Sequence, residues 1–196
     1  EINRIVTDSL TDYFFTTSNY ANENLIKLGV SKSNIFFVGN VMIDTLLKNE
    51  NRLKKPSLWD DLNLSNKEYL VMTLHRPSNV DEEHLLKRLI TQIVTLSKDY
   101  PIIFPVHPRT EKLLRHLNLN FENLHYVNPL GYLEFNYLVK HALAVITDSG
   151  GITEETTVMN IPCITLRDST ERPETCDIGT NILVGSDSEK IKNAFN

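Results

Sequence analysis

Short apolar runs alternate with helical patterns along most of this chain, and this alternation predicts its fold. Between the runs, apolar residues recur every three or four positions, which is the spacing of a helix that buries one side. Strands buried on both faces read as continuous apolar runs, so the pattern predicts an α/β fold, a Rossmann-like parallel sheet with helices on both faces. The predicted strands are residues 69–74, 102–106, 124–127, 144–146, 163–166 and 182–184, and the predicted helices include 81–98, 110–117 and 132–141.

The first part of the chain repeats the pattern on a smaller scale. Ser18 or Asn19 is placed to cap a helix over residues 20–28, and Gly29 is placed to end it. Further elements are expected as a helix over 2–10, strands over 12–17 and 35–38, and a helical bridge over 41–47. We therefore expect residues 1–43 to be the C-terminal part of one Rossmann-like lobe, 44–66 a passage between lobes, and 67–196 a nucleotide-binding lobe truncated at its end.

The segment AVITDSGGITEE, residues 144–155, carries the strongest local signal for a ligand. It predicts a strand, a tight turn at Gly150 and Gly151, and then a helix. Glycines let a ligand approach the backbone, and the unpaired N–H groups of the helix start attract an anion such as phosphate. Glu155 lies about one helical turn further on, where its carboxylate can accept hydrogen bonds from the two hydroxyls of a ribose. The alternative is that the glycines only let helix and strand pack closely.

Polar residues follow most of the predicted strands, and the carboxyl ends of parallel strands share one edge where ligands bind. Two histidines, several arginines and a glycine turn on one edge indicate a diphosphate site. Each group also has a plainer interpretation: His75 and Arg76 pairing with Asp81 or Glu82, His107 acting as a rigid turn residue, and residues 171–174 forming a solvated charge cluster. The rim groups are His75 and Arg76, His107 and Arg109, residues 148–151, and residues 167–172.

Composition and charge exclude several classes of function. The net charge of −5 without a basic stripe argues against a nucleic-acid partner, and no apolar run approaches the roughly 20 residues that span a membrane. We therefore expect a cytoplasmic protein without a membrane or nucleic-acid partner. Cys163 and Cys176 are expected to be reduced thiols, and no spacing supports a metal site. The other histidines are expected on the surface or in packing: His84, His116, His125 and His141.

Four motifs, taken in order, resemble the non-hydrolysing UDP-N-acetylglucosamine 2-epimerases. They are TLHRPSNVD at 73–81, PVHPRT at 105–110, ITDSGGITEE at 146–155 and LRDSTERPET at 166–175. The resemblance covers essentially the whole chain. It implies a two-lobed fold like that of GT-B glycosyltransferases, with the nucleotide-sugar between the lobes and no cofactor. It also implies UDP-GlcNAc or UDP as ligand, and a homodimer.

The resemblance also implies a role for particular residues. Ser149, Gly150 and Gly151 would contact the diphosphate, Glu155 the ribose hydroxyls, and Phe135 the uracil through its backbone. His75 would act near the substrate phosphates, and Arg172 would line the same rim. Arg76 and His107 fall where some bacterial members hold a second, activating UDP-GlcNAc. This chain reads Arg-Pro-Ser-Asn after His75 where many of those members read Arg-Arg-Glu-Asn, a departure that weighs against such activation.

The implied reaction inverts C2 of the sugar, interconverting UDP-GlcNAc and UDP-ManNAc. UDP is eliminated to leave 2-acetamidoglucal and is then added back to the other face. The acid and base are expected to be carboxylates. By resemblance they lie before Glu1, so we expect residues 1–196 to hold UDP without epimerising it. The rivals are a GT-B glycosyltransferase, a hydrolysing epimerase that releases free N-acetylmannosamine, and a nucleotide-binding regulatory module.

Overall fold

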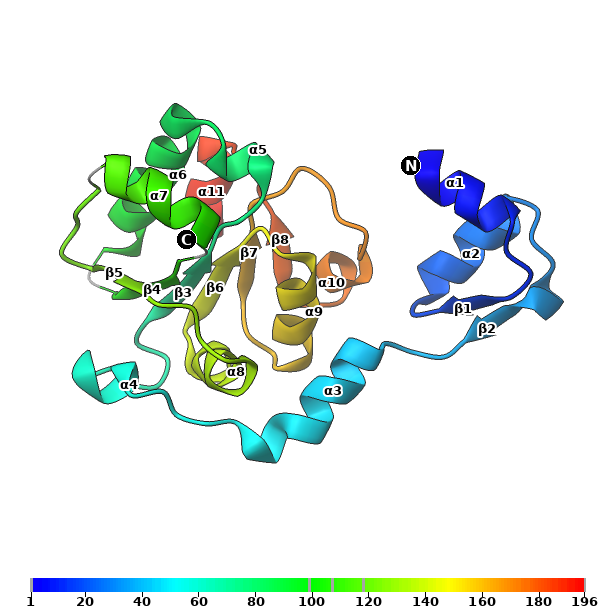
Figure 1. The fold of residues 1–196 in the computed structure, drawn as a ribbon, viewed down its shortest axis with the longest axis horizontal. Helices are drawn as coiled ribbons and strands as arrows, with labels where there is room; N and C mark the ends of the chain where they lie inside the picture. The colour runs from blue at the N-terminus through cyan, green and yellow to red at the C-terminus, as the bar shows by residue number, and fades with distance from the viewer. Residues whose placement is uncertain (1, 99, 107, 118, 196) are drawn as a thin grey trace. The chain divides into compact units, whose positions relative to one another are not determined.

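A computed structural model describes residues 2–98, 100–106, 108–117 and 119–195. The chain divides into two compact units, Glu1–Leu47 and Lys48–Asn196, and each is described by itself. Figure 1 labels the elements of both units. The second unit contains the glycine turn and most of the residues singled out in the sequence.

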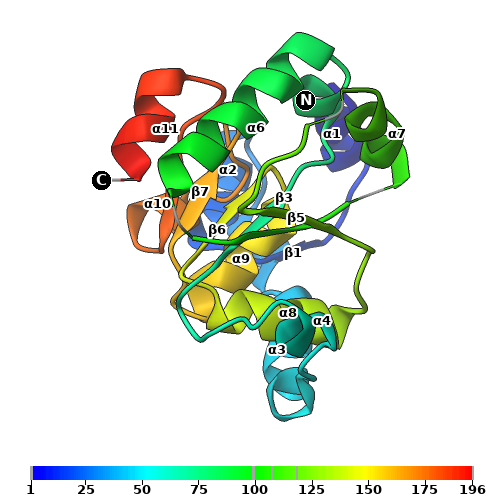
Figure 2. The ribbon, with the colours of Figure 1, turned by 90° about the vertical axis from the view of Figure 1, so that its left-hand side faces the viewer.

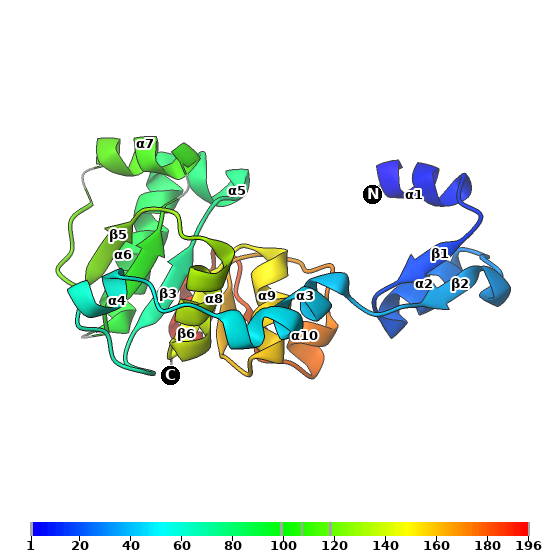
Figure 3. The same ribbon diagram turned by 60° about the horizontal axis from the view of Figure 1, so that its bottom comes forward.

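The first unit contains a two-stranded parallel sheet, β1 with β2, in which Phe14 pairs with Ile35. The predicted helix cap is present, because Ser18 accepts a hydrogen bond from the amide of Ala21 at 3.2 Å. Gly29 follows the helix with φ +90°, a conformation that favours glycine. Figure 3 shows α2 beside the two strands. The elements are α1 (Ile2–Ser9), β1 (Phe14–Thr16), α2 (Asn19–Lys27), η1 (Lys32–Asn34), β2 (Ile35–Phe37) and α3 (Val41–Asn49), whose last residues belong to the second unit.

The second unit is built on a six-stranded sheet in the order β5-β4-β3-β6-β7-β8, with every neighbouring pair parallel. This confirms the predicted parallel α/β sheet. Its strands are β3 (Leu70–Thr73), β4 (Ile102–Pro105), β5 (Leu124–Val127), β6 (Ala144–Thr147), β7 (Cys163–Thr165) and β8 (Asn181–Leu183). Its helices are η2 (Glu50–Arg52), α4 (Leu58–Asp61), α5 (Pro77–Val80), α6 (Glu83–Ser97), α7 (Pro108–Leu117), α8 (Tyr132–His141), α9 (Gly150–Val158), α10 (Glu174–Asp177) and α11 (Ser188–Ala194).

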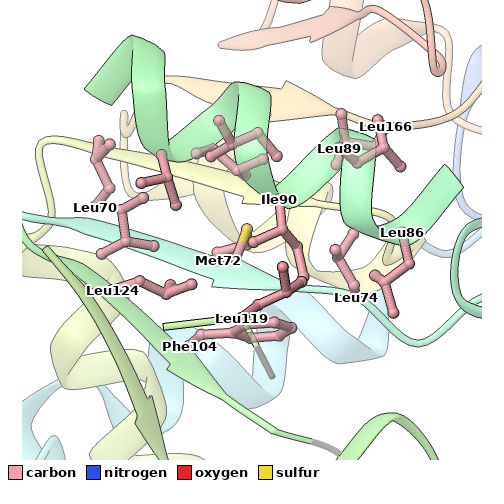
Figure 4. Packing of buried hydrophobic residues seen from close by; sticks show 14 of the residues in the cluster. Leu70, Met72, Leu74, Leu86, Leu89, Ile90, Phe104, Leu119, Leu124 and Leu166 are labelled. Atoms are coloured by element: carbon pink, nitrogen blue, oxygen red, sulfur yellow. The ribbon is translucent and has the colours of Figure 1, made fainter. Parts of the chain in front are cut away.

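Strand β3 shows why the sheet is covered on both faces. Side chains alternate between faces along a strand, so Leu70 and Met72 enter one apolar cluster while Tyr69 and Val71 enter another. The first cluster includes the apolar sides of α6 and α11, and Figure 4 shows its packing at close range. The second cluster includes residues of α8 and α4. Figure 2 shows α6 and α11 on one side of the sheet and α8 and α4 on the other.

The segment after β3 differs from the single helix predicted over 81–98. Pro77 starts a helical turn, α5, and a second helix, α6, begins at Glu83. Proline fixes φ near the helical value and lacks an N–H that the first turn would leave unpaired, so it starts a helix well. On α6 the fully buried side consists of Leu86, Leu89, Ile90 and Ile93. Leu85 and Leu96 on the same helix are only partly buried.

Residues 50–66 belong to the second unit by their contacts. Trp59 packs edge-on against the rings of Tyr69, Tyr137 and His141, with centroid separations of 5.5, 5.5 and 5.7 Å. His141 also stacks on Tyr137 and places Nδ1 2.8 Å from the Tyr137 carbonyl oxygen. His141 is therefore a packing residue, as predicted.

Candidate functional site

The candidate site lies where the sheet order reverses. Strands β4 and β5 follow β3 on one side, whereas β6 lies on the other side of β3 and is followed outward by β7 and β8. In parallel sheets, ligands bind beyond the carboxyl ends of the strands at such a switch point. The residues that follow β3, β6 and β7 are the predicted rim groups: residues 75–76, 148–151 and 167–172.

Asp148, directly after β6, connects these segments. Its side chain is fully buried, yet it accepts hydrogen bonds from the backbone amides of His75, at 3.1 Å, and Arg76, at 2.9 Å. The Asn79 side-chain amide donates a further bond of 3.1 Å. Burial alone would raise the pKa of Asp148, but the hydrogen bonds from His75, Arg76 and Asn79 outweigh it and lower the pKa. Asp148 is therefore a buried anion that fixes the loop after β3.

His75 faces this anion. Its Nδ1 lies 2.8 Å from Oδ1 of Asp148, and its side chain is 44% exposed. An ionised carboxylate accepts only, so Nδ1 carries the proton and Nε2 is the nitrogen left for a ligand. The pairing with Asp148 replaces the plainer interpretation in which the carboxylate partner of His75 is Asp81 or Glu82.

Arg76 and Asn79 tie the same loop to two strands. The Arg76 Nε donates to the backbone carbonyl of Asp148 at 2.9 Å. The Asn79 side chain donates both to Asp148 and to the carbonyl of Leu166, at 3.0 Å. The ends of β3, β6 and β7 are thus held by one hydrogen-bonded network. No role for Asn79 was predicted, because nothing in its local sequence shows that two distant strand ends meet beside it.

The order of strand, glycines and helix is as predicted, but the two glycines belong to the helix rather than to a turn before it. Ser149 is extended and precedes α9, whose first two residues are Gly150 and Gly151. The Ser149 amide donates to Oγ1 of Thr147 at 3.0 Å, and this hydroxyl lies 2.7 Å from Oγ1 of Thr73 on β3. The side chain of Ser149 makes no capping hydrogen bond to the described first turn of α9. The amides of the first turn of α9 therefore donate no hydrogen bond to the Ser149 side chain, which leaves them available to an anion.

Arg167 lies against Gly150. A Cβ placed on Gly150 would stand 3.3 Å from Nη1 of Arg167 and 4.0 Å from Oε2 of Glu171. Nη2 of Arg167 donates to Oε1 of Glu171 at 2.8 Å. Glycine at position 150 therefore makes room for a guanidinium as well as for any ligand.

Glu155 is buried on α9 and has a partner that was not predicted. The Tyr132 hydroxyl, at the start of α8, donates to Oε1 of Glu155 at 3.0 Å. Burial raises the pKa of Glu155, while hydrogen bonds from Tyr132 and Asn136 act in the opposite direction. Burial also raises the pKa of Tyr132 to about 12, with Glu155 adding to the effect. The Phe135 amide donates to the Gly131 carbonyl at 2.8 Å, so this N–H is already used within α8.

Arg172 connects the segment after β7 to α9, because its Nε lies 2.7 Å from Oε1 of Glu154. His107 lies outside the described residues, so its predicted place at a second site has no structural account. Within the described residues, no group of three His, Cys, Asp or Glu side chains is arranged to hold a metal ion. Nor does any described helix combine the length and apolar character needed to cross a membrane.

Both cysteines are free thiols. Cys163, on β7, is buried, and this burial raises the pKa of its thiol to about 11. At neutral pH it is therefore protonated and behaves as a small apolar core residue rather than a nucleophile.

Comparison with known proteins places this geometry in a family. Residues 1–196 match the model of the UDP-N-acetylglucosamine 2-epimerase family. A UDP-N-acetylglucosamine 2-epimerase of Methanococcus maripaludis is 42% identical over 203 residues, which cover 98% of this chain and 56% of the relative.

Solved structures agree. That of the Methanocaldococcus jannaschii UDP-GlcNAc 2-epimerase, in complex with UDP-GlcNAc and UDP, is 41% identical with a TM-score of 0.86, covering 99% of this chain and 56% of that one. The Neisseria meningitidis enzyme bound to UDP-GlcNAc is 30% identical with a TM-score of 0.86, covering 100% and 55%. The chain spans about half the length of the curated relatives it matches. The resemblance inferred from the four motifs is confirmed, and the chain belongs to the UDP-N-acetylglucosamine 2-epimerase family.

Proposed function

We propose that this chain provides the nucleotide-binding half of a UDP-N-acetylglucosamine 2-epimerase, an isomerase that interconverts UDP-GlcNAc and UDP-ManNAc. The observation that carries the proposal is the buried Asp148, which holds His75 at the start of the glycine turn through a 2.8 Å contact. Asp148 thereby fixes the position of His75, which we assign to the substrate phosphates, relative to the backbone of residues 149–151, which we assign to the diphosphate.

The diphosphate is assigned to the turn formed by Ser149, Gly150 and Gly151. The Ser149 amide is used by Thr147, so the anion is assigned to the amides of Gly150 and Gly151, the first residues of α9, and to the positive end of the helix dipole. The neighbouring Arg172 is assigned to the same rim. Its pairing with Glu154 orients the guanidinium along α9.

The nucleoside is assigned to the start of α8 beside α9. Glu155 accepts hydrogen bonds from the ribose hydroxyls, and its bond from Tyr132 keeps the carboxylate in place. Phe135, one turn into α8, lines the uracil position through its backbone. Because its N–H is used within the helix, we assign its contribution to the base to van der Waals contact of the backbone.

The chemistry follows from the weak acidity of the C2 proton. Breaking the C2–H bond becomes feasible when the electron pair forms the C1–C2 double bond and UDP leaves from C1. Addition of UDP to C1 and of a proton to the opposite face of C2 then completes the inversion. We assign His75, whose Nδ1 is held by Asp148, to stabilise through Nε2 the negative charge that develops on the departing diphosphate. We assign no proton transfer at C2 to the described residues.

Deuterium incorporation tests the proposal. The protein that carries this chain is incubated with UDP-GlcNAc in deuterated water, without an acceptor. An epimerase places deuterium at C2 of both UDP-sugars, and His75→Ala reduces the rate by roughly 100-fold or more. A glycosyltransferase leaves C2 unlabelled, whereas accumulation of free N-acetylmannosamine with UDP identifies a hydrolysing enzyme. Either outcome overturns the proposal.

We further propose that the protein works as a cytoplasmic homodimer, as the family resemblance suggests. Light scattering coupled to size-exclusion chromatography measures the mass of the particle. A monomeric mass at assay concentrations would contradict the dimer.

A further inference from the structure

The Arg167 guanidinium is almost buried and has few hydrogen-bond partners among the described residues. Its side chain is only 7% exposed, and the guanidinium lies against Gly150 at the start of α9. Among the described residues, only Glu171 accepts a hydrogen bond from it, at 2.8 Å from Nη2. A guanidinium has five N–H donors, and no described nitrogen of Arg167 is both fully buried and unpaired, so the donors that Glu171 leaves free can be reached by water or by a ligand. The protein therefore holds a fixed positive charge with spare donors beside the glycine turn.

Glu171 differs from Arg167 in its freedom to move. Its side chain is 68% exposed and lies in the loop between β7 and α10. The hydrogen bond from Arg167 lowers the pKa of Glu171 to about 2, and the positive charge of Arg76 contributes in the same direction. The carboxylate is thus ionised and attracted by two arginines. Because the side chain is exposed, it can rotate into water at small cost, whereas the buried guanidinium cannot leave.

The carboxylate of Glu171 lies close to the start of α9. Its Oε2 would stand 4.0 Å from a Cβ on Gly150, the first residue of α9. An anion already lies at the helix start to which we assign the diphosphate. Two anions cannot share this position without strong repulsion.

We propose that Arg167 is a further diphosphate-binding residue and that Glu171 is a stand-in anion, which the diphosphate displaces from the Arg167 guanidinium on binding. The inference rests on the proposed function, because it takes the ligand to be a uridine diphosphate. In the ligand-free protein, Glu171 keeps the arginine oriented and its charge compensated. On binding, phosphate oxygens take over the donors, and Glu171 turns into solvent.

A purely structural ion pair would behave differently. Removing the charge of Glu171 would then lower stability slightly and leave nucleotide affinity unchanged. Under our proposal, the same change removes a competing anion and tightens the binding of phosphate-bearing ligands only.

Calorimetry on the full chain distinguishes the two. We expect Glu171→Gln to bind UDP about 3- to 10-fold more tightly than the unmodified chain, and Arg167→Met to bind it about 10-fold or more weakly. Uridine, which lacks phosphate, should bind the unmodified chain and Glu171→Gln equally. The matched control is Glu50→Gln, because Glu50 is 50% exposed and also makes a 2.8 Å ion pair, with Lys140. It should leave UDP affinity unchanged.

The experiment distinguishes a failure of the proposed function from a failure of this inference. If UDP does not bind the unmodified chain, the proposed function falls and this inference with it. If UDP binds but Glu171→Gln leaves affinity unchanged or weakens it, this inference is wrong and the proposed function stands. Because Glu171 is exposed, Glu171→Gln should fold normally. Its UDP affinity therefore tests the inference even if Arg167→Met does not fold. A crystal structure with UDP gives a direct reading: the Arg167–Glu171 bond should be replaced by one from Arg167 to a phosphate oxygen, and its persistence would overturn the inference.

Discussion

His75 and Asp148 are separated by 73 residues in the chain, yet Nδ1 of one lies 2.8 Å from Oδ1 of the other. The same carboxylate accepts hydrogen bonds from the backbone amides of His75 and Arg76. The loop after β3 and the turn before α9 are therefore held together by these hydrogen bonds. Any ligand held by the turn meets an imidazole whose orientation is already set.

Replacing Asp148 with asparagine should damage both stability and activity. The amide group of asparagine turns one acceptor into a donor facing other donors, so we expect a loss of about 3 kcal/mol in the free energy of unfolding. Epimerisation should fall roughly 100-fold or more, because His75 loses its tautomer and orientation. Urea unfolding and a coupled assay measure the two effects. The control Asp60→Asn, at an exposed ion pair with Lys55, should change stability by less than about 1 kcal/mol.

Asp148 should also make the stability of the folded protein depend on pH. A carboxyl group whose pKa is lowered on folding stabilises the protein above its unfolded pKa of about 3.9, and this contribution is lost as the pH falls through the folded pKa. The difference in Tm between the unmodified chain and Asp148→Asn should therefore be constant near pH 6 and shrink below about pH 4. Scanning calorimetry across this range measures it. A difference that does not change with pH would show that Asp148 is not the ionised group described.

Glu155 should set the preference for a ribose. Glu155→Gln should weaken UDP binding by about 1.5–3 kcal/mol and reduce the preference for UDP over 2′-deoxy-UDP. Burial raises the pKa of Glu155, so acidification should protonate it, and weaken UDP binding, at a higher pH than for an ordinary glutamate. Tyr132→Phe removes a hydrogen bond that lowers this pKa and should move the loss to still higher pH. Titration calorimetry at several pH values tests both, and equal pH profiles for the unmodified chain and Glu155→Gln would exclude Glu155 from the site.

Gly150→Ala should weaken UDP binding by roughly 10-fold. The added methyl group would stand 3.3 Å from Nη1 of Arg167, so the guanidinium has to shift beside the diphosphate position. The control is Ser57→Ala, because Ser57 also precedes a helix, α4, its side chain makes no capping hydrogen bond, and it has no assigned part in the site. The control should keep its UDP affinity. Equal affinities for the two variants would contradict the close contact.

Local features of the fold were predictable wherever neighbouring residues decide them. Helix α8 runs over Tyr132–His141 as predicted, because Gly131 precedes an apolar pattern with helical spacing. The turn at Pro77 was missed, because a proline after a strand is compatible with a loop as well as with the first turn of a helix. The order of strand, glycines and helix over residues 144–158 was predicted, but the glycines were expected in a turn before the helix, whereas Gly150 is the first residue of α9.

By itself, the sequence determined the parallel α/β class, the order of strand, glycines and helix over residues 144–158, and the family, since these follow from periodicity and from motifs of adjacent residues. Only the tertiary structure decided which rim residues meet. The pairing of β3 with β6 brings Asp148 to His75, and the approach of α8 to α9 brings Tyr132 to Glu155. Such contacts depend on strand order and helix packing, which arise from the burial of the whole core and leave no mark on the residues beside them in the chain.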